Sequence, residues 1–256
     1  MKRFVVASLL GFCTALLAQP ASYLAIEAAI NKAGRQRMLS EFLVKEYVQV
    51  AENVLPGNAR GSLFETITIF DDQLSDLKAF ASDAETRATV DELEKQWLRF
   101  RSIATRPPER SNALLLRAAG LALHEAAEHN AAALERRAGT ARGKLVGLAG
   151  RQRMLSQRIA KNYLLLGWKL TDPSIREELI AADAQFDKAQ RELTAAASSD
   201  ALRAELAEVE KLWRGLRPLL TREVDIRFNR VKVVDATDAI LSRMERVTTL
   251  FEKEPR

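Results

Sequence analysis

The octapeptide AGRQRMLS at residues 33–40 recurs letter for letter at residues 149–156, an offset of 116 residues. The same offset maps Trp97 onto Trp213, far downstream of the octapeptide. A match of this kind indicates a tandem duplication, and internal repeats constrain the fold more strongly than local patterns do. The two copies differ almost everywhere else, so the retained octapeptide marks the region where we expect the function to lie.

The composition favours a helical protein that does not bind nucleic acid. Hydrophobic residues make up 47% of the 256 residues, enough for a buried core, and Gly (11) and Pro (7) are scarce. Abundant Ala, Leu, Glu and Arg favour helix over sheet. The net charge of +5 is small. No block of Lys and Arg is backed by stacking aromatic residues, which argues against a nucleic-acid partner.

The N-terminus is typical of a secretory signal. Lys2 and Arg3 precede an apolar run at residues 4–18, and small residues follow it. We therefore expect a signal peptide at residues 1–21 and a periplasmic mature chain, with an uncleaved anchor as the alternative. Cys13, the only cysteine, lies in this segment after Phe12, which argues against lipidation.

Helical periodicity and turn signals predict four helices in each copy. Leu39, Leu43 and Tyr47 follow one another at four-residue steps, as the apolar face of a helix does. We predict an all-α fold of two tandem four-helix antiparallel bundle repeats, at residues 22–138 and 139–256. The predicted helices are 22–54, 62–80, 84–104, 109–137, 140–170, 173–197, 200–216 and 219–252.

Three boundaries rest on proline, glycine and capping residues. The run Pro56-Gly57-Asn58 is expected to separate the first two helices, and Pro218 to kink or end the seventh. Between the repeats, Gly139 can end one helix and Thr140 can cap the next. A continuous helix through this joint is also compatible with the flanking alanines.

The octapeptide places an arginine beside a glycine on one helical face. Gly34 and Arg37 are three residues apart, and Gly150 and Arg153 repeat this spacing. Glycine within a helix is costly, and close approach of another backbone is the usual reason for it. Two shielded arginines brought together would repel, and a small planar oxyanion between them would relieve this. Arg35 points elsewhere around the helix and is expected to matter less.

Plainer interpretations remain open for these and other residues. The arginines could form a solvated face or pair with carboxylates of neighbouring helices. His124 and His129 are five residues apart, which does not match the zinc-protease spacing, so we expect surface or helix-packing histidines. Trp97 and Trp213 are expected to be core anchors. No catalytic constellation or cofactor motif is evident, so we expect a protein that is not an enzyme and needs no cofactor or metal.

At the octapeptide the chain resembles two related sensory families. Residues 30–38, INKAGRQRM, resemble the P-box of NarX-type nitrate/nitrite sensor domains. They are also similar to the N-terminal domain of type IV pili methyl-accepting chemotaxis transducers, called PilJ-like. Residues 146–154, VGLAGRQRM, are a looser second match. The resemblance covers both repeats, essentially the whole mature chain.

The resemblance implies a fold and a ligand site. In that family each domain is a four-helix bundle, and nitrate lies between the first helices of two subunits, bound by the arginine that precedes Met. Here the two repeats would form an intramolecular pseudo-dimer with one shared site. The residues that the resemblance implies for anion binding are Arg37, Arg153, Gly34, Gly150, Lys32, Met38 and Met154.

Departures from the family pattern limit what carries over. Leu148 stands at the position equivalent to Lys32, and Gly147 at that of Asn31, so the site would be asymmetric and its ligand could differ from nitrate. Family sensors carry a second transmembrane helix and an output module, neither of which is evident here. We therefore expect a periplasmic protein that binds or senses nitrate or nitrite and signals through a membrane sensor or chemoreceptor. The alternative is a ligand-free helical adaptor that docks onto a chemoreceptor, sensor kinase or pilus component.

Overall fold

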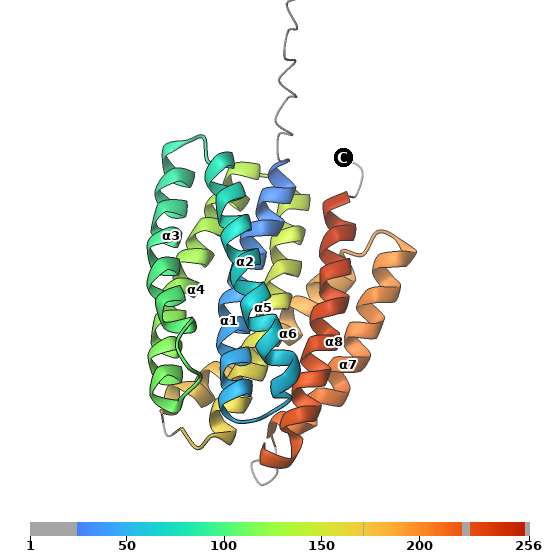
Figure 1. The fold of residues 1–256 in the computed structure, drawn as a ribbon. Helices are drawn as coiled ribbons and strands as arrows, with labels where there is room; N and C mark the ends of the chain where they lie inside the picture. The colour runs from blue at the N-terminus through green and yellow to red at the C-terminus, as the bar shows by residue number, and fades with distance from the viewer. Residues whose placement is uncertain (1–24, 171, 222–225, 254–256) are drawn as a thin grey trace, which may run out of the picture.

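The computed structural model describes residues 25–170, 172–221 and 226–253, and within these ranges every regular element is an α-helix (Figure 1). This confirms the all-α prediction. None of the described helices is long and apolar enough to span a membrane. The predicted signal segment lies outside the described residues. The helices are α1 (Ile26–Ala51), α2 (Pro56–Phe80), α3 (Ala84–Ala104), α4 (Arg110–Ala138), α5 (Ala141–Gly167), α6 (Pro173–Ala195), α7 (Asp200–Thr221) and α8 (Ile226–Lys253).

Capping residues set several of these boundaries. Asp83 accepts a hydrogen bond from the backbone N–H of Thr86 at the start of α3. At the joint between the repeats, Gly139 has a φ of 61°, the left-handed conformation that ends many helices. The Thr140 hydroxyl then accepts from the N–H of Gly143 and caps α5. The chain therefore breaks at this joint and does not continue as one helix.

Two helix boundaries predicted from prolines are wrong. The second helix does not begin at Ser62, because Pro56 starts α2 as its first residue. Proline needs no hydrogen-bonded N–H there, and its fixed φ suits the first turn. Pro218 does not end α7, which continues to Thr221, and α8 begins at Ile226 rather than at residue 219. The buried apolar face of α7 retains the helix despite the missing hydrogen bond.

The two repeats lie side by side, with α1 and α5 as the central pair (Figure 1). Glu27 pairs with Arg142 near the start of both helices, and Glu41 pairs with Arg158 four turns later, so α1 and α5 run in the same direction. Around α1 pack α2 and α4, with α3 against α4. Around α5 pack α6 and α8, with α7 against α8. This is the predicted pseudo-dimer of four-helix units.

The internal equivalence extends into the two cores. Trp97 stacks on Phe70 with ring centroids 3.8 Å apart, and Trp213 packs on Phe186 at 4.2 Å. All four side chains are buried. The tryptophans are core anchors, as predicted, and both pairs obey the 116-residue offset.

Candidate functional site

Arg37 and Arg153 meet at the crossing of α1 and α5. Both side chains are fully buried. A Cβ placed on Gly34 would lie 3.5 Å from the Cα of Gly150, 3.4 Å from Arg37 Nη2 and 3.3 Å from Arg153 Nη2. The two glycines therefore let the helices approach closely, as the sequence predicted. They also leave room for both guanidinium groups.

Each arginine has a carboxylate and a backbone carbonyl as partners. Arg37 Nη1 donates to Glu128 Oε2 at 3.0 Å and its Nη2 to the carbonyl of Gly147 at 3.1 Å. In the second repeat, Arg153 Nη1 donates to Glu245 Oε2 at 2.8 Å. Arg153 Nη2 donates to the backbone carbonyl of Asn31 at 3.2 Å, the position equivalent to Gly147. The contacts therefore repeat across the pseudo-twofold axis.

The other arginines of the octapeptide join this site from the opposite repeat. Arg151, on α5, pairs with Glu128 of the first repeat. Arg35, on α1, lies 3.5 Å from Glu245 of the second. Arg35 lies on another face of its helix, but its long side chain reaches the site. We call the resulting set the arginine cluster; it comprises Arg35, Arg37, Arg151, Arg153, Glu128 and Glu245.

Sequence reasoning missed the two glutamates. They come from α4 and α8, and their offset is 117 residues rather than 116, so the repeat does not align them. Burial would raise the pKa of the Glu128 carboxyl, but Arg37 and Arg151 outweigh it and hold that pKa below its ordinary value. Glu128 is therefore ionised at neutral pH and neutralises part of the buried charge.

The arginine cluster still has positive charge and free donors. Four arginines face Glu128 and Glu245, and Glu135 also pairs with Arg37 at 3.7 Å, so the arginines outnumber the carboxylates that contact them. The Nε atoms of Arg37 and Arg153 are buried and have no hydrogen-bond partner. Burial also lowers the pKa of Arg153, and Glu245 offsets this effect only in part. A buried donor without a partner is costly, and an anion would supply the missing acceptor.

The two sides of the cluster differ at one position. Asn31 accepts from Arg153 Nη2 through Oδ1 at 2.8 Å and donates to Glu252 at 2.6 Å. On the other side, a Cβ on Gly147 would lie 2.2 Å from Glu135 Oε1, so Glu135 occupies the space of the missing side chain. Burial raises the pKa of the Glu135 carboxyl, and Arg37, at 3.7 Å, offsets this only in part.

Of the three other predicted site residues, one pairs with a different partner and two belong to the hydrophobic core. Lys32 Nζ pairs with Asp76 of α2 at 2.8 Å and is therefore directed away from the crossing. Met38 and Met154 are buried within the hydrophobic core. The structure thus brings both arginines and both glycines together and places Lys32 outside this group.

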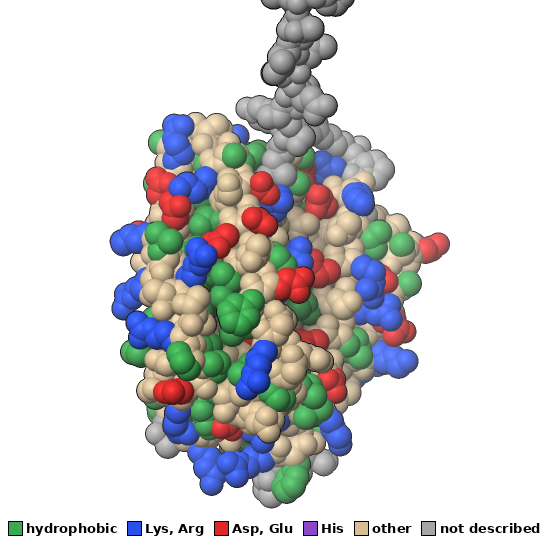
Figure 2. Space-filling view, viewed as in Figure 1, with side chains coloured by type: hydrophobic (Ala, Val, Ile, Leu, Met, Phe, Trp, Pro, Cys, Tyr) green, Lys and Arg blue, Asp and Glu red, His purple; other side chains and the backbone are tan. Residues whose placement is uncertain are grey.

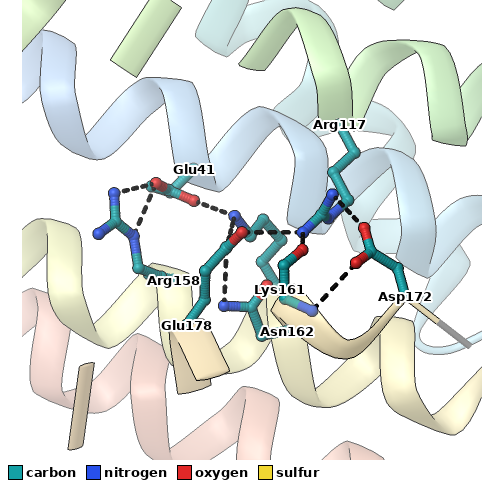
Figure 3. A network of polar contacts seen from close by, with 8 residues as sticks. Glu41, Arg117, Arg158, Lys161, Asn162, Asp172 and Glu178 are labelled. Atoms are coloured by element: carbon teal, nitrogen blue, oxygen red, sulfur yellow. Dashed lines mark hydrogen bonds and ion pairs between the residues drawn. The ribbon is translucent and has the colours of Figure 1, made fainter. Parts of the chain in front are cut away.

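A second polar layer joins the repeats further along α1 and α5 (Figure 3). Glu41 accepts from Arg158 Nη2 at 2.7 Å and pairs with Lys161 Nζ at 2.7 Å. Burial alone would raise the pKa of Glu41, but Arg158 and Lys161 hold it well below its ordinary value. Lys161 also contacts Glu178, which pairs with Arg117 of α4. Arg117 also pairs with Asp172, so three cations face three carboxylates and the layer fastens the repeats together.

His124 packs against the second layer. Its Nδ1 lies 3.6 Å from Glu41 Oε1. Burial lowers the pKa of His124 to about 4, despite the nearby Glu41, so this histidine is neutral at pH 7. It is a helix-packing residue, as the sequence indicated.

Comparison with known families gives one match, which occurs twice. The family model described as type IV pili methyl-accepting chemotaxis transducer N-term matches residues 22–128 and 137–233. The two segments together span more than half of the chain, and each contains one octapeptide. No curated protein and no solved structure matches the chain.

Proposed function

Because the chain belongs to the type IV pili methyl-accepting chemotaxis transducer N-terminal family, we propose that it is a periplasmic sensory protein that binds a small oxyanion, nitrate or nitrite, in the arginine cluster. A membrane chemoreceptor or sensor would read its state. The signal-like N-terminus supports the compartment. The family itself indicates a role in chemotaxis or pilus signalling, and the ligand is our inference from the site.

One observation carries the proposal. Two fully buried guanidinium groups converge at the glycine crossing between the repeats, each with an Nε donor that has no partner. The cluster also has more positive than negative charge. Planar, paired donors in a shielded place suit a planar monovalent oxyanion.

The proposed binding event is an exchange of anions. In the described structure, Glu128 and Glu245 occupy the Nη1 donors of Arg37 and Arg153. A bound oxyanion would compete with both carboxylates and weaken the links from α1 to α4 and from α5 to α8. Binding would thereby alter the packing of both repeats at once, which is a route to a signal that a partner can detect.

A thermal-shift titration with nitrate and nitrite tests the proposal. A ligand that binds only the folded chain stabilises it by about 2.7 kcal/mol at a hundredfold excess over Kd. Arg37→Ala and Arg153→Ala should each abolish most of the shift. Lys32→Ala removes a cation from the same helix but not from the cluster, so it should preserve the shift. Glu128→Gln removes the competing carboxylate and should strengthen binding.

The adaptor remains the second candidate function, and one observation favours it. Both arginines are already paired with carboxylates, as expected of a purely structural cluster. On this hypothesis nitrate and nitrite give no shift in the intact protein or in Glu128→Gln. A shift that survives both arginine substitutions would place any anion site elsewhere and reject the arginine cluster as its location.

A further inference from the structure

The two equivalent tryptophans differ in one hydrogen bond. Trp97 Nε1 donates to Asp71 Oδ1 at 2.6 Å. Trp213 is equally buried, but its Nε1 has no hydrogen-bond partner. Asp187 stands at the position equivalent to Asp71, so the second repeat retains the acceptor residue and yet leaves the indole unpaired.

A residue specific to the second repeat explains the difference. Asp187 pairs with Arg191, four residues later on α6. The position equivalent to Arg191 is Ser75 in the first repeat, where it cannot hold the aspartate by charge. Arg217 of α7 lies 3.5 Å from Asp187, but its equivalent Arg101 lies 3.2 Å from Asp71, so Arg191 is the partner that differs between the repeats. The aspartate is thereby drawn away from the indole, and a buried N–H without a partner is costly.

The unpaired indole belongs to a surface pocket of about 450 Å³ between α6 and α7. Asp187, at the position of the aspartate that accepts from Trp97, lines the same pocket. A neighbouring pocket of about 760 Å³ shares three of the lining residues and extends the groove. None of the lining residues belongs to the arginine cluster. The residues that line the first pocket are Asp187, Glu210, Trp213, Arg214, Arg217 and Pro218.

The pocket offers charged groups of both signs, and its lining includes a proline within α7. Pro218 has no N–H, so the carbonyl of Arg214, four residues earlier, receives no helical hydrogen bond from it. The first repeat has Ser102 and Leu98 at these two positions and lacks both features. A ligand carboxylate would satisfy the Trp213 donor. A ligand ammonium would pair with the carboxylates of Asp187 and Glu210, in competition with the arginines that contact them.

We propose that the groove between α6 and α7 binds a small zwitterion that carries a carboxylate and an ammonium group, of which a free amino acid is the simplest. The carboxylate accepts from Trp213 Nε1, and the ammonium lies at the Asp187 and Glu210 side of the pocket. The site is present in the second repeat alone. It is independent of the arginine cluster and of any oxyanion bound there.

Indole N–H resonances test this directly, because the chain has three tryptophans and each gives one signal. The standard amino acids are added singly to the ¹⁵N-labelled protein. At least one should move the Trp213 resonance saturably and leave the Trp97 resonance in place. Acetate and ethylammonium at the same concentration should not reproduce the shift, because each supplies only one of the two charges.

A repeat-swap variant sharpens the test. Arg191→Ser restores the residue of the first repeat and frees Asp187 to accept from Trp213, which should weaken binding at least tenfold. The matched control is Arg203→Ser, which removes an arginine from the neighbouring pocket without contacting Asp187. It should bind as the parent does.

Three outcomes would overturn the proposal. The first is that no amino acid moves the Trp213 resonance. The second is that acetate moves it as far as the best amino acid does, which would leave an acceptor site with no role for the ammonium. The third is equal weakening by Arg191→Ser and Arg203→Ser, which would indicate a general charge effect.

Discussion

Each repeat contains an equivalent buried lysine, and the carboxylate that pairs with it within the repeat comes from a different helix in each. In the first, Lys45 Nζ lies 3.2 Å from Glu46 of its own helix α1. In the second, Lys161 Nζ lies 3.2 Å from Glu178 of α6. At the 116-residue offset, Glu46 corresponds to Asn162, which donates to Glu178 at 3.2 Å.

The first repeat has a neutral residue at the position equivalent to Glu178. Glu178 corresponds to Ser62, whose hydroxyl donates to Glu46 at 2.5 Å. Within its own repeat each lysine thus has one carboxylate and one neutral polar partner, with the two roles exchanged between helices. Each lysine also pairs with a second carboxylate from the opposite repeat, Asp238 for Lys45 at 2.5 Å and Glu41 for Lys161 at 2.7 Å. Divergence has preserved the charge balance of this layer without preserving residue identity, because a buried ammonium needs a carboxylate from either helix.

A second difference leaves one salt bridge without a symmetric counterpart. Glu41 and Arg158 pair across the interface of the repeats. The equivalent positions are Gln157 and Phe42, which carry no charge. We call Glu41 with Arg158 the charged half, and Gln157 with Phe42 the uncharged half, of these equivalent positions. Exchanging their residues measures what each pair contributes.

The largest effect is expected when the charged half loses its carboxylate. Glu41→Gln copies Gln157 and leaves Arg158 with an uncompensated buried charge. Removing one partner of a buried pair costs about 3 kcal/mol. The free energy of unfolding from urea titrations should fall by about this amount at pH 7.

A double substitution and the pH dependence check this assignment. Glu41→Gln with Arg158→Phe reproduces the uncharged half and should recover at least half of the loss. The low pKa of Glu41 stabilises the fold above the ordinary carboxyl value of 4.5, and this contribution is lost as the pH falls toward the folded pKa. The difference between parent and Glu41→Gln should therefore shrink below pH 4.5. No loss at pH 7 would reject the assignment.

A smaller effect should distinguish the tryptophans. Trp97→Phe and Trp213→Phe remove similar apolar volume from equivalent core positions, but only the first removes a hydrogen bond, to Asp71. Trp97→Phe should therefore destabilise by about 1 kcal/mol more than Trp213→Phe. Thermal unfolding of both variants measures the difference, and equal losses would mean that the Trp213 indole has a partner in solution.

The smallest effect concerns the two glutamates at the edge of the arginine cluster. The raised pKa of Glu135 means that the folded chain holds its proton more tightly than the unfolded chain, so stability falls as the pH rises. Glu135→Gln should raise the melting temperature at pH 7 by less than about 4 °C. This gain should disappear at pH 4.

The equivalent change gives the control. Glu252→Gln weakens the hydrogen bond from Asn31 and should lower the melting temperature slightly at pH 7. The two substitutions are therefore expected to act in opposite directions. The same sign for both at pH 7 would contradict the structural difference between Asn31 and Gly147.

The sequence by itself determined the duplication, the helical class and the two arginines at glycine-bearing positions. These follow from local patterns: apolar residues every three or four positions, capping residues such as Asp83, and the repeated octapeptide. Glycine beside arginine on one helical face also predicted the close crossing. Such signals lie within a few turns of helix, so no knowledge of distant contacts is needed.

Only the tertiary structure decided which groups neutralise those arginines. Glu128 lies 91 residues from Arg37, and Glu245 lies 92 from Arg153, so their pairing depends on how α4 and α8 pack. The unpaired indole of Trp213 likewise depends on Asp187 pairing with Arg191. A charged side chain can reach any of several partners, and the sequence does not say which one packing brings within hydrogen-bond distance.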